Sequence, residues 1–226
     1  METTEEISSL PVSQWAIAHW YLVRRPMMVI SAAILCVVAL ASLFAPWLAP
    51  YPYEAIDLAL GASPPTGAHW MGTDSLGRDL LSRALFGGRI SLAVGLVGTM
   101  VSLVIGVLYG SIAGYCGGRI DELLMRFVDL MYSLPYLFLV IILLVFFSSS
   151  IIMLFVALGL VQWLTMARIV RGQVLSLKSA EFVEAARLSG TGGLGILLRH
   201  LLPNMLGPIV VYATLTVPNV ILQEAF

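Results

Sequence analysis

The feature that most constrains this chain is a series of apolar runs, each long enough to cross a lipid bilayer as a helix. A membrane-crossing helix needs about 20 predominantly apolar residues. Five segments meet that length: 27–49, 90–115, 127–147, 150–170 and 205–226. Backbone N–H and C=O groups find no water inside a bilayer, so such segments fold as helices. The sequence therefore predicts an all-α, polytopic membrane protein.

The composition supports a bilayer environment. Only 11% of the 226 residues are charged, whereas a soluble domain carries about 25%. The net charge of −1 offers no basic footprint for nucleic acid. Cys36 and Cys116 lie within or beside apolar runs without CxxC spacing, so neither a disulfide nor a metal site is predicted. The first apolar run exceeds the roughly 7–15 residues of a signal-peptide core, which indicates a retained anchor helix.

The basic residues predict how the chain is oriented, because Lys and Arg are enriched in cytoplasmic loops. With the N-terminus inside, nine basic residues lie in cytoplasmic segments and three, Arg78, Arg83 and Arg89, lie outside. The predicted organisation is a cytoplasmic segment 1–26, a first span 27–49, an external segment 50–89 and a core domain 90–226. The core domain contains a cytoplasmic loop at 171–203.

The external segment is predicted to contain one short helix. Prolines keep its first half from being helical. Thr73 and Asp74 supply capping oxygens for a helix that continues to about Phe86, and Gly87 and Gly88 are expected to end it.

Small residues recur every four positions along the second span: Gly98, Ser102, Gly106, Gly110 and Gly114. In a membrane, small residues at this spacing let two helix backbones approach closely. The stripe therefore predicts a helix-packing surface. A contact within the chain and a contact with a second subunit are both compatible with it.

Three residues within the later spans are candidates for a transport pathway. Pro135 removes a backbone hydrogen bond and should bend the third span, and irregular backbone in transporters often faces protein or a water-filled path. A purely structural kink is the alternative. Gln162 and Trp163 interrupt the apolar pattern of the fourth span, where either packing or a pathway would explain them.

No enzymatic motif is present in the sequence. It contains no GxxxxGK[ST] phosphate loop, no HExxH and no GxSxG, and its three histidines lie on separate segments. No catalytic residue, cofactor-binding residue or metal ligand is therefore predicted in this chain.

The cytoplasmic loop contains the stretch EFVEAARLSGTGGLGILLRHLLPN, residues 181–204. It predicts a short helix ended by Gly190, a glycine-rich turn, and a second segment from which Pro203 starts the next span. Small and apolar side chains gather on one side of the first helix: Phe182, Ala185, Ala186 and Leu188. Such a helix either presents a surface to a partner or folds against its own protein.

Glu184-Ala185-Ala186, then Gly190, then Leu202-Pro203 resembles the EAA motif of ATP-binding-cassette (ABC) importer permeases. The spacing matches the family pattern, and His200 stands where the pattern has isoleucine. The resemblance implies that these six residues form a coupling helix that docks in a cleft of an ATPase subunit. Ala186→Glu is then expected to place an unpaired charge in the docked surface, which costs several kcal/mol, and to prevent ATPase association.

A second stretch narrows the family. HWMGTDSLGRDLLSRALFGGRISL, residues 69–92, is similar to the outer segment of dipeptide, oligopeptide and nickel permeases of the "C" subunit type. RFVDLMYSLP and LTMARIVRGQVLSL are similar to the same branch, and the resemblance covers about Met27 to Phe226. The run QWLTMARIVRGQVLSLK favours oligopeptide transport over dipeptide or nickel transport.

The resemblance implies a non-catalytic permease subunit with the type I ABC importer fold, in the bacterial inner membrane. The family has six spans, so the sixth is missing here and a truncated C-terminus is expected. The implied partners are a second permease subunit, two ATP-binding subunits that use ATP and Mg, and an external substrate-binding protein. Two rival functions need no ATPase: an ion-coupled secondary transporter, which would want acids at central span positions that hold none, and a non-transporting scaffold.

Overall fold

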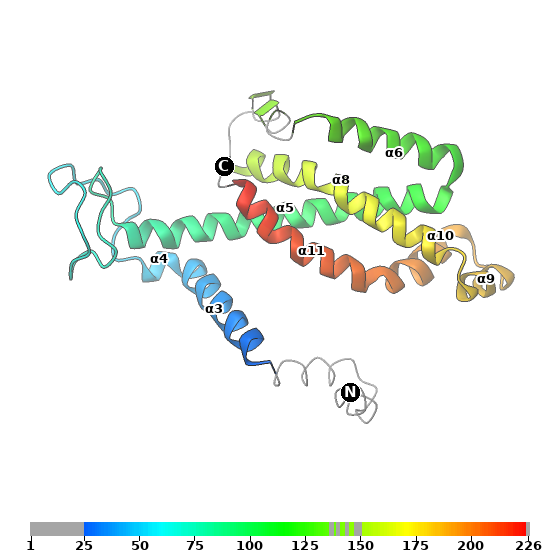
Figure 1. Ribbon diagram of the computed structural model, residues 1–226, viewed down its shortest axis with the longest axis horizontal. Helices are drawn as coiled ribbons and strands as arrows, with labels where there is room; N and C mark the ends of the chain where they lie inside the picture. The colour runs from blue at the N-terminus through cyan, green and yellow to red at the C-terminus, as the bar shows by residue number, and fades with distance from the viewer. Residues whose placement is uncertain (1–24, 136–137, 139–140, 143–144, 147–150, 225–226) are drawn as a thin grey trace. The chain divides into compact units, whose positions relative to one another are not determined.

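The computed structural model of the chain describes residues 25–135, 138, 141–142, 145–146 and 151–224 (Figure 1). These residues form helices and connecting loops, and the only β-type pairing among them is an isolated bridge between Thr73 and Asp79. They divide into two compact units, one ending at Ile90 and the other starting at Ser91. The predicted all-α class is confirmed.

The first unit begins with helix α3, Pro26–Leu43, and the short helix α4, Ala45–Leu48. Pro26 occupies the first helical position, where its missing N–H has no intrahelical partner to lose. Nearly every side chain of α3 is exposed within the described structure, as expected for an apolar helix surrounded by lipid.

Helix α5, Leu80–Cys116, begins later and runs much further than the predicted outer helix. Asp79 caps it, since the backbone N–H and the hydroxyl of Ser82 both donate to Asp79 Oδ2 at 2.8 Å. The prediction that Gly87 and Gly88 end a helix is wrong, because α5 continues through both. Neither glycine has a positive φ; at Gly88 an added Cβ would lie only 2.5 Å from Ser42 Oγ, so its small size serves packing.

A tight turn joins α5 to helix α6, Gly118–Ser133. Gly117 and Gly118 take positive φ values of 65° and 54°, which glycine adopts without steric cost. At its other end α6 stops at Ser133, and Leu134 is extended with φ −81° and ψ 135°. The predicted bend at Pro135 is therefore a break, because the proline ring disfavours helical backbone in the residue before it.

The second half of the chain contains α8, Ile151–Leu177, and α9, Glu181–Leu188. It then forms one continuous helical stretch made of α10, Gly193–Gly195, the π-helical turn η1, Ile196–Leu201, and α11, Leu202–Glu224. Pro203 does not start this helix, as the sequence suggested, but lies within it. The wider π turn immediately before Pro203 relieves the clash that a proline makes with the preceding turn.

Three helical stretches of the described residues are long and apolar enough to cross a membrane: Pro26–Leu43, Leu80–Cys116 and Gly193–Glu224. They contain the second predicted span and overlap the first, which was predicted to continue to residue 49, and the fifth, whose residues 225–226 lie outside the described part. The third and fourth predicted spans include residues outside the described part, so they stay predictions.

Helix α8 lies beside both α6 and α11 (Figure 1). Two ion pairs join it to α6. The Arg171 guanidinium donates to both carboxylate oxygens of Asp121, at 2.5 and 2.7 Å, and Arg168 pairs with Asp129 at 2.5 Å. The two-pronged geometry fixes orientation as well as distance, so α6 and α8 are held in one register.

The stripe of small residues on α5 faces helices of the same chain. At Gly106 and Gly114, an added Cβ would lie 2.5 Å and 2.8 Å from the Cβ atoms of Met166 and Val174 on α8. Gly98 approaches Val220 of α11, Gly110 approaches the carbonyl of Ala167, and Ser102 is fully buried. Of the two arrangements left open by the sequence, the structure shows contact within the chain.

Candidate functional site

The first candidate site is α9, the short helix between α8 and the last helical stretch. Its end is fixed by a glycine cap: the N–H of Thr191 donates to the carbonyl of Ala186 and the N–H of Gly190 to that of Arg187, both at 3.0 Å. Gly190 has φ +79°, the left-handed conformation that this cap requires. Gly190 ends the helix as predicted.

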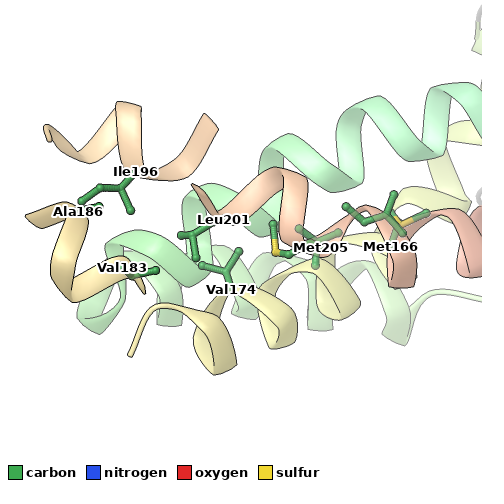
Figure 2. Close-up of a cluster of buried hydrophobic side chains, with 9 residues drawn as sticks. Met166, Val174, Val183, Ala186, Ile196, Leu201 and Met205 are labelled. Carbon is green, nitrogen blue, oxygen red and sulfur yellow. The ribbon is translucent and has the colours of Figure 1, made fainter. Parts of the chain in front are cut away.

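One face of α9 is packed inside the protein. Val183 is fully buried and Ala186 is 7% exposed. Figure 2 shows both among the side chains of a buried cluster to which α8, η1 and α11 also contribute, with Ile196 next to Ala186. The sequence placed Ala186 on a surface presented to a partner, and the structure instead places it against its own chain. Ala186 is buried because α9 packs against η1. The pattern of apolar residues in α9 alone does not predict this contact.

The other positions of α9 are exposed. Leu188 is 90% exposed, Phe182 is 38% exposed, and Ala185 and Glu184 are also exposed. Glu181 and Glu184 lie in the first turn and Arg187 in the last, which is the charge order that the helix dipole favours. A small apolar patch on a rigid, capped helix is a surface suited to contact with another protein.

The remaining residues of the predicted coupling set lie in the following stretch. Leu202 is half-buried and packs on the same cluster, whereas Pro203 is exposed. A hollow of about 420 Å³ opens beside the end of α9. Its lining includes Gly190 and the largely exposed Leu194 and Leu198.

The second candidate site is a cavity of about 440 Å³ between α6, α8 and α11. It brings together two of the three predicted pathway residues, Pro135 and Gln162. The side-chain amide of Gln162 donates to Gln223 Oε1 of α11 at 2.6 Å. Tyr132 of α6 and Thr165 of α8 are hydrogen-bonded to each other through their hydroxyls and also line the cavity.

Trp163, the third predicted pathway residue, lies elsewhere. It is 8% exposed and packs edge-on against Tyr109, with ring centroids 4.7 Å apart, in a cluster with Val128, Leu164 and Ala167. Its packing in this cluster keeps the Trp163 ring out of the cavity lining, which takes Val161, Gln162, Leu164 and Thr165 from α8.

Sequence reasoning missed Tyr132, Thr165 and Gln223. These residues could have been found as uncharged polar residues inside apolar runs, because a polar group in lipid needs a hydrogen-bond partner. Gln223 is 61 positions away from Gln162, so the pairing depends on how α8 and α11 are packed together.

Within the described residues, no group of three or more His, Cys, Asp or Glu side chains could hold a metal ion.

Comparisons with known proteins agree with this architecture. The model of the family described as "binding-protein-dependent transport system inner membrane component" matches residues 106–226. The model of the N-terminal transmembrane domain of oligopeptide transport permease C matches residues 13–65.

Curated relatives extend the match over nearly the whole chain. The oligopeptide transport system permease protein OppC of Haemophilus influenzae is 46% identical over 224 residues, covering 98% of this chain and 72% of that protein. OppC of Escherichia coli K12 is 47% identical over 216 residues, covering 95% and 72%. The dipeptide transport permease DppC of Bacillus subtilis is 45% identical over 181 residues, covering 80% and 57%.

The helices and these matches define a multi-pass membrane permease. The chain belongs to the family of binding-protein-dependent transport system inner membrane components, and within it to the C-type permeases of ABC importers. Membership of this family sets aside the two rival functions, the ion-coupled transporter and the scaffold.

Proposed function

We propose that this chain is the C-type permease subunit of an ATP-driven oligopeptide importer of the inner membrane, with its N-terminus in the cytoplasm. In this assembly it works with a second permease subunit, two ATP-binding subunits and an external binding protein. The excess of Lys and Arg in the segments assigned to the cytoplasm supports the orientation. ATP and Mg are used by the ATP-binding subunits, and this chain performs no catalysis.

The observation that carries the proposal is the two-sided character of α9. Val183 and Ala186 fix one face to the protein, while Phe182, Ala185 and Leu188 leave an apolar patch exposed on the other. The exposed patch docks on an ATP-binding subunit. The buried face prevents α9 from moving independently of the helices behind it.

The buried cluster gives the motion of α9 a route into the membrane. It joins Val183 of α9 to Val174 of α8, Leu201 of η1 and Met205 of α11. The ion pairs of Arg171 and Arg168 extend the connection from α8 to α6. Closure of the ATP-binding subunits would therefore displace the three helices that surround the cavity, and packed interiors transmit such displacements because they deform little.

Oligopeptides are the proposed cargo. Several of the relatives, from four genera, are named as oligopeptide permeases, and the cavity lining is neutral across its described residues. A neutral lining does not favour one cargo charge over another, which suits peptides of varied sequence.

The test is a charge placed on the exposed patch. Leu188→Glu puts a carboxylate into the docked contact, where desolvation without a partner is costly. We expect the ATP-binding subunits to be lost from the complex that co-purifies with this chain, and peptide uptake to fall with them. Leu58→Glu is the matched control, because Leu58 is 73% exposed on the external segment. Normal co-purification and uptake with Leu188→Glu would contradict the proposal.

The structure changes the interpretation of the Ala186→Glu substitution. Ala186 is buried against its own chain, so a glutamate there disrupts the packing of α9 on Ile196 before any partner is involved. Ala185→Glu, at the neighbouring exposed position, is the substitution that addresses docking itself.

A further inference from the structure

We propose that Gln162 and Gln223 are the residues through which this chain contacts the main chain of the passing peptide. Bonded to each other they form an amide clasp, and a peptide unit of the cargo replaces one partner of that clasp. This assignment rests on the proposed function, and it adds the residues and the part of the cargo that they recognise.

The position of the pair supports the assignment. Gln162 belongs to α8 and Gln223 to α11, both side chains line the cavity of about 440 Å³, and both are half-buried. Their amide groups bond to each other at 2.6 Å. The clasp therefore lies where two helices of the permease meet at the cavity.

The chemistry of the pair matches that of a peptide backbone. A glutamine side chain offers two N–H donors and a carbonyl acceptor, and each peptide unit offers one N–H and one C=O. The clasp satisfies one donor and one acceptor that would be costly to leave unpaired in apolar surroundings. A peptide unit can take the place of either glutamine with the same kind of bond, so the exchange has little net cost.

The clasp is also weak enough to open. A single hydrogen bond between membrane helices contributes modestly, because the separated groups find other partners. The glutamine amides bond to the peptide about as strongly as to each other. They can therefore release the peptide again, as transport requires.

The other polar groups at the cavity are already engaged. The hydroxyls of Tyr132 and Thr165 bond to each other, and the Arg168 guanidinium stacks 4.1 Å above the Tyr132 ring while pairing with Asp129. The other described lining residues are apolar: Met131, Leu134, Pro135, Val161 and Leu164. A glutamine amide has two N–H donors and a carbonyl acceptor, more than the single bond of the clasp uses. The clasp is thus the group best placed to bind cargo, and it recognises the peptide backbone rather than the side chains.

The experiment uses cells that make the complete transporter. It compares Gln162→Leu, Gln223→Leu and the double substitution, with Gln173→Leu as a control on the same helix outside the cavity lining. Uptake is measured for three tripeptides with acidic, basic and apolar side chains. A fourth peptide carries N-methyl groups on its backbone nitrogens, which removes the N–H donors.

We expect each single substitution to lower the maximum uptake rate about tenfold, by the same factor for all three unmodified peptides. We also expect it to reduce the preference for the unmodified over the N-methylated peptide. The control should change neither quantity. A loss that depends on side-chain charge, an unchanged rate, or an unchanged preference would overturn the assignment.

The double substitution separates cargo contact from a purely structural clamp. Replacing both partners of a hydrogen bond by apolar groups can leave stability nearly unchanged, so a clamp would be restored and uptake would recover towards wild type. Cargo contact instead predicts that the double variant stays as low as the singles. Co-purification of the ATP-binding subunits is measured for each glutamine variant and for Leu188→Glu. Low uptake with normal co-purification places the defect at the cavity, whereas normal co-purification with Leu188→Glu contradicts the proposed function itself.

Discussion

Asp79 holds several groups of the first unit together through one carboxylate. One oxygen accepts from the N–H and hydroxyl of Ser82, and the other lies 3.0 Å from His69 Nδ1, whose ring stacks on Tyr51. Burial raises the pKa of this carboxyl, but the hydrogen bonds from Ser82 and His69 outweigh it and leave the pKa below its usual value. The charged form is therefore the one that stabilises the fold.

Asp79→Ala should destabilise the start of α5 by about 1 kcal/mol, the usual cost of losing a helix cap. Limited proteolysis within residues 50–89 would show this loss of stability as faster cleavage, and Glu54→Gln, at an exposed position, is the control. Equal cleavage rates for Asp79→Ala and wild type would contradict the capping role.

The same carboxylate predicts a pH dependence. Its folded pKa lies below the unfolded value of about 3.9, so its contribution is fully present above that pH and is lost as the pH falls through the folded pKa. Tryptophan fluorescence, which includes Trp70 of this segment, should therefore report a low-pH transition that is weaker in Asp79→Asn. An identical titration in both proteins would count against the assignment.

Gly190 is a position where backbone conformation alone decides which residue fits. Its φ of +79° is unfavourable for residues with a Cβ, although no atom lies within 4 Å of where that Cβ would be. Gly190→Ala should destabilise the end of α9 by about 1 kcal/mol. Gly172→Ala, in open space within α8, should be neutral or slightly stabilising. Hydrogen exchange of the α9 amides distinguishes them, and equal protection in both variants would contradict this account.

At the scale of helices, the sequence predicted where membrane-length segments lie better than where helices begin and end. The same residue type behaved differently at different places: Gly190 ends a helix, whereas Gly87 and Gly88 lie inside one. Pro135 follows a helix end, whereas Pro203 lies within a helix after a π turn. Tertiary packing and cap geometry decide these outcomes, and neither can be obtained from the local sequence.

In the candidate site, too, the sequence predicts single residues, whereas the packed structure decides their partners. The spacing of Glu184, Ala185, Ala186 and Gly190 predicts a coupling motif, but the inward position of Ala186 depends on Ile196. Pro135 and Gln162 were identified as polar or irregular points in apolar runs, but Gln223 joined them only once α8 and α11 were placed together. Pairings between distant segments are set by the packed structure, so single positions can be predicted more readily than their partners.

The approach of α5 to α8 predicts a strong size limit at Gly110. An added Cβ there would overlap the Ala167 carbonyl and crowd Val170, so Gly110→Ile should destabilise the helix pair by roughly 1–3 kcal/mol. Leu108→Ile, two positions away and 60% exposed, should have little effect. Thermal unfolding of the purified protein in detergent compares the two, and an unchanged midpoint for Gly110→Ile would show that the helices do not pack this closely.

At the scale of the whole molecule, packed helices connect the exposed face of α9 to the cavity between α6, α8 and α11. On the proposed function, the exposed face of α9 receives the movement of an ATP-binding subunit. The buried cluster connects α9 to α8 and α11, and the ion pairs of Arg168 and Arg171 connect α8 to α6. These are the helices around the cavity that contains the glutamine pair. Under this proposal, the same helices perform both coupling and transport.

The most direct test of this account is disulfide cross-linking from α9 in the assembled transporter. Cys36 and Cys116 are free and exposed, so both are first replaced by alanine. Leu188→Cys should then cross-link to an ATP-binding subunit that carries a cysteine in its docking cleft, and the yield should change when ATP is added. Val183→Cys is the control and should not cross-link, because Val183 is fully buried in its own chain. Absence of that cross-link at Leu188 throughout the ATP cycle would contradict the central claim that α9 couples this permease to ATP hydrolysis.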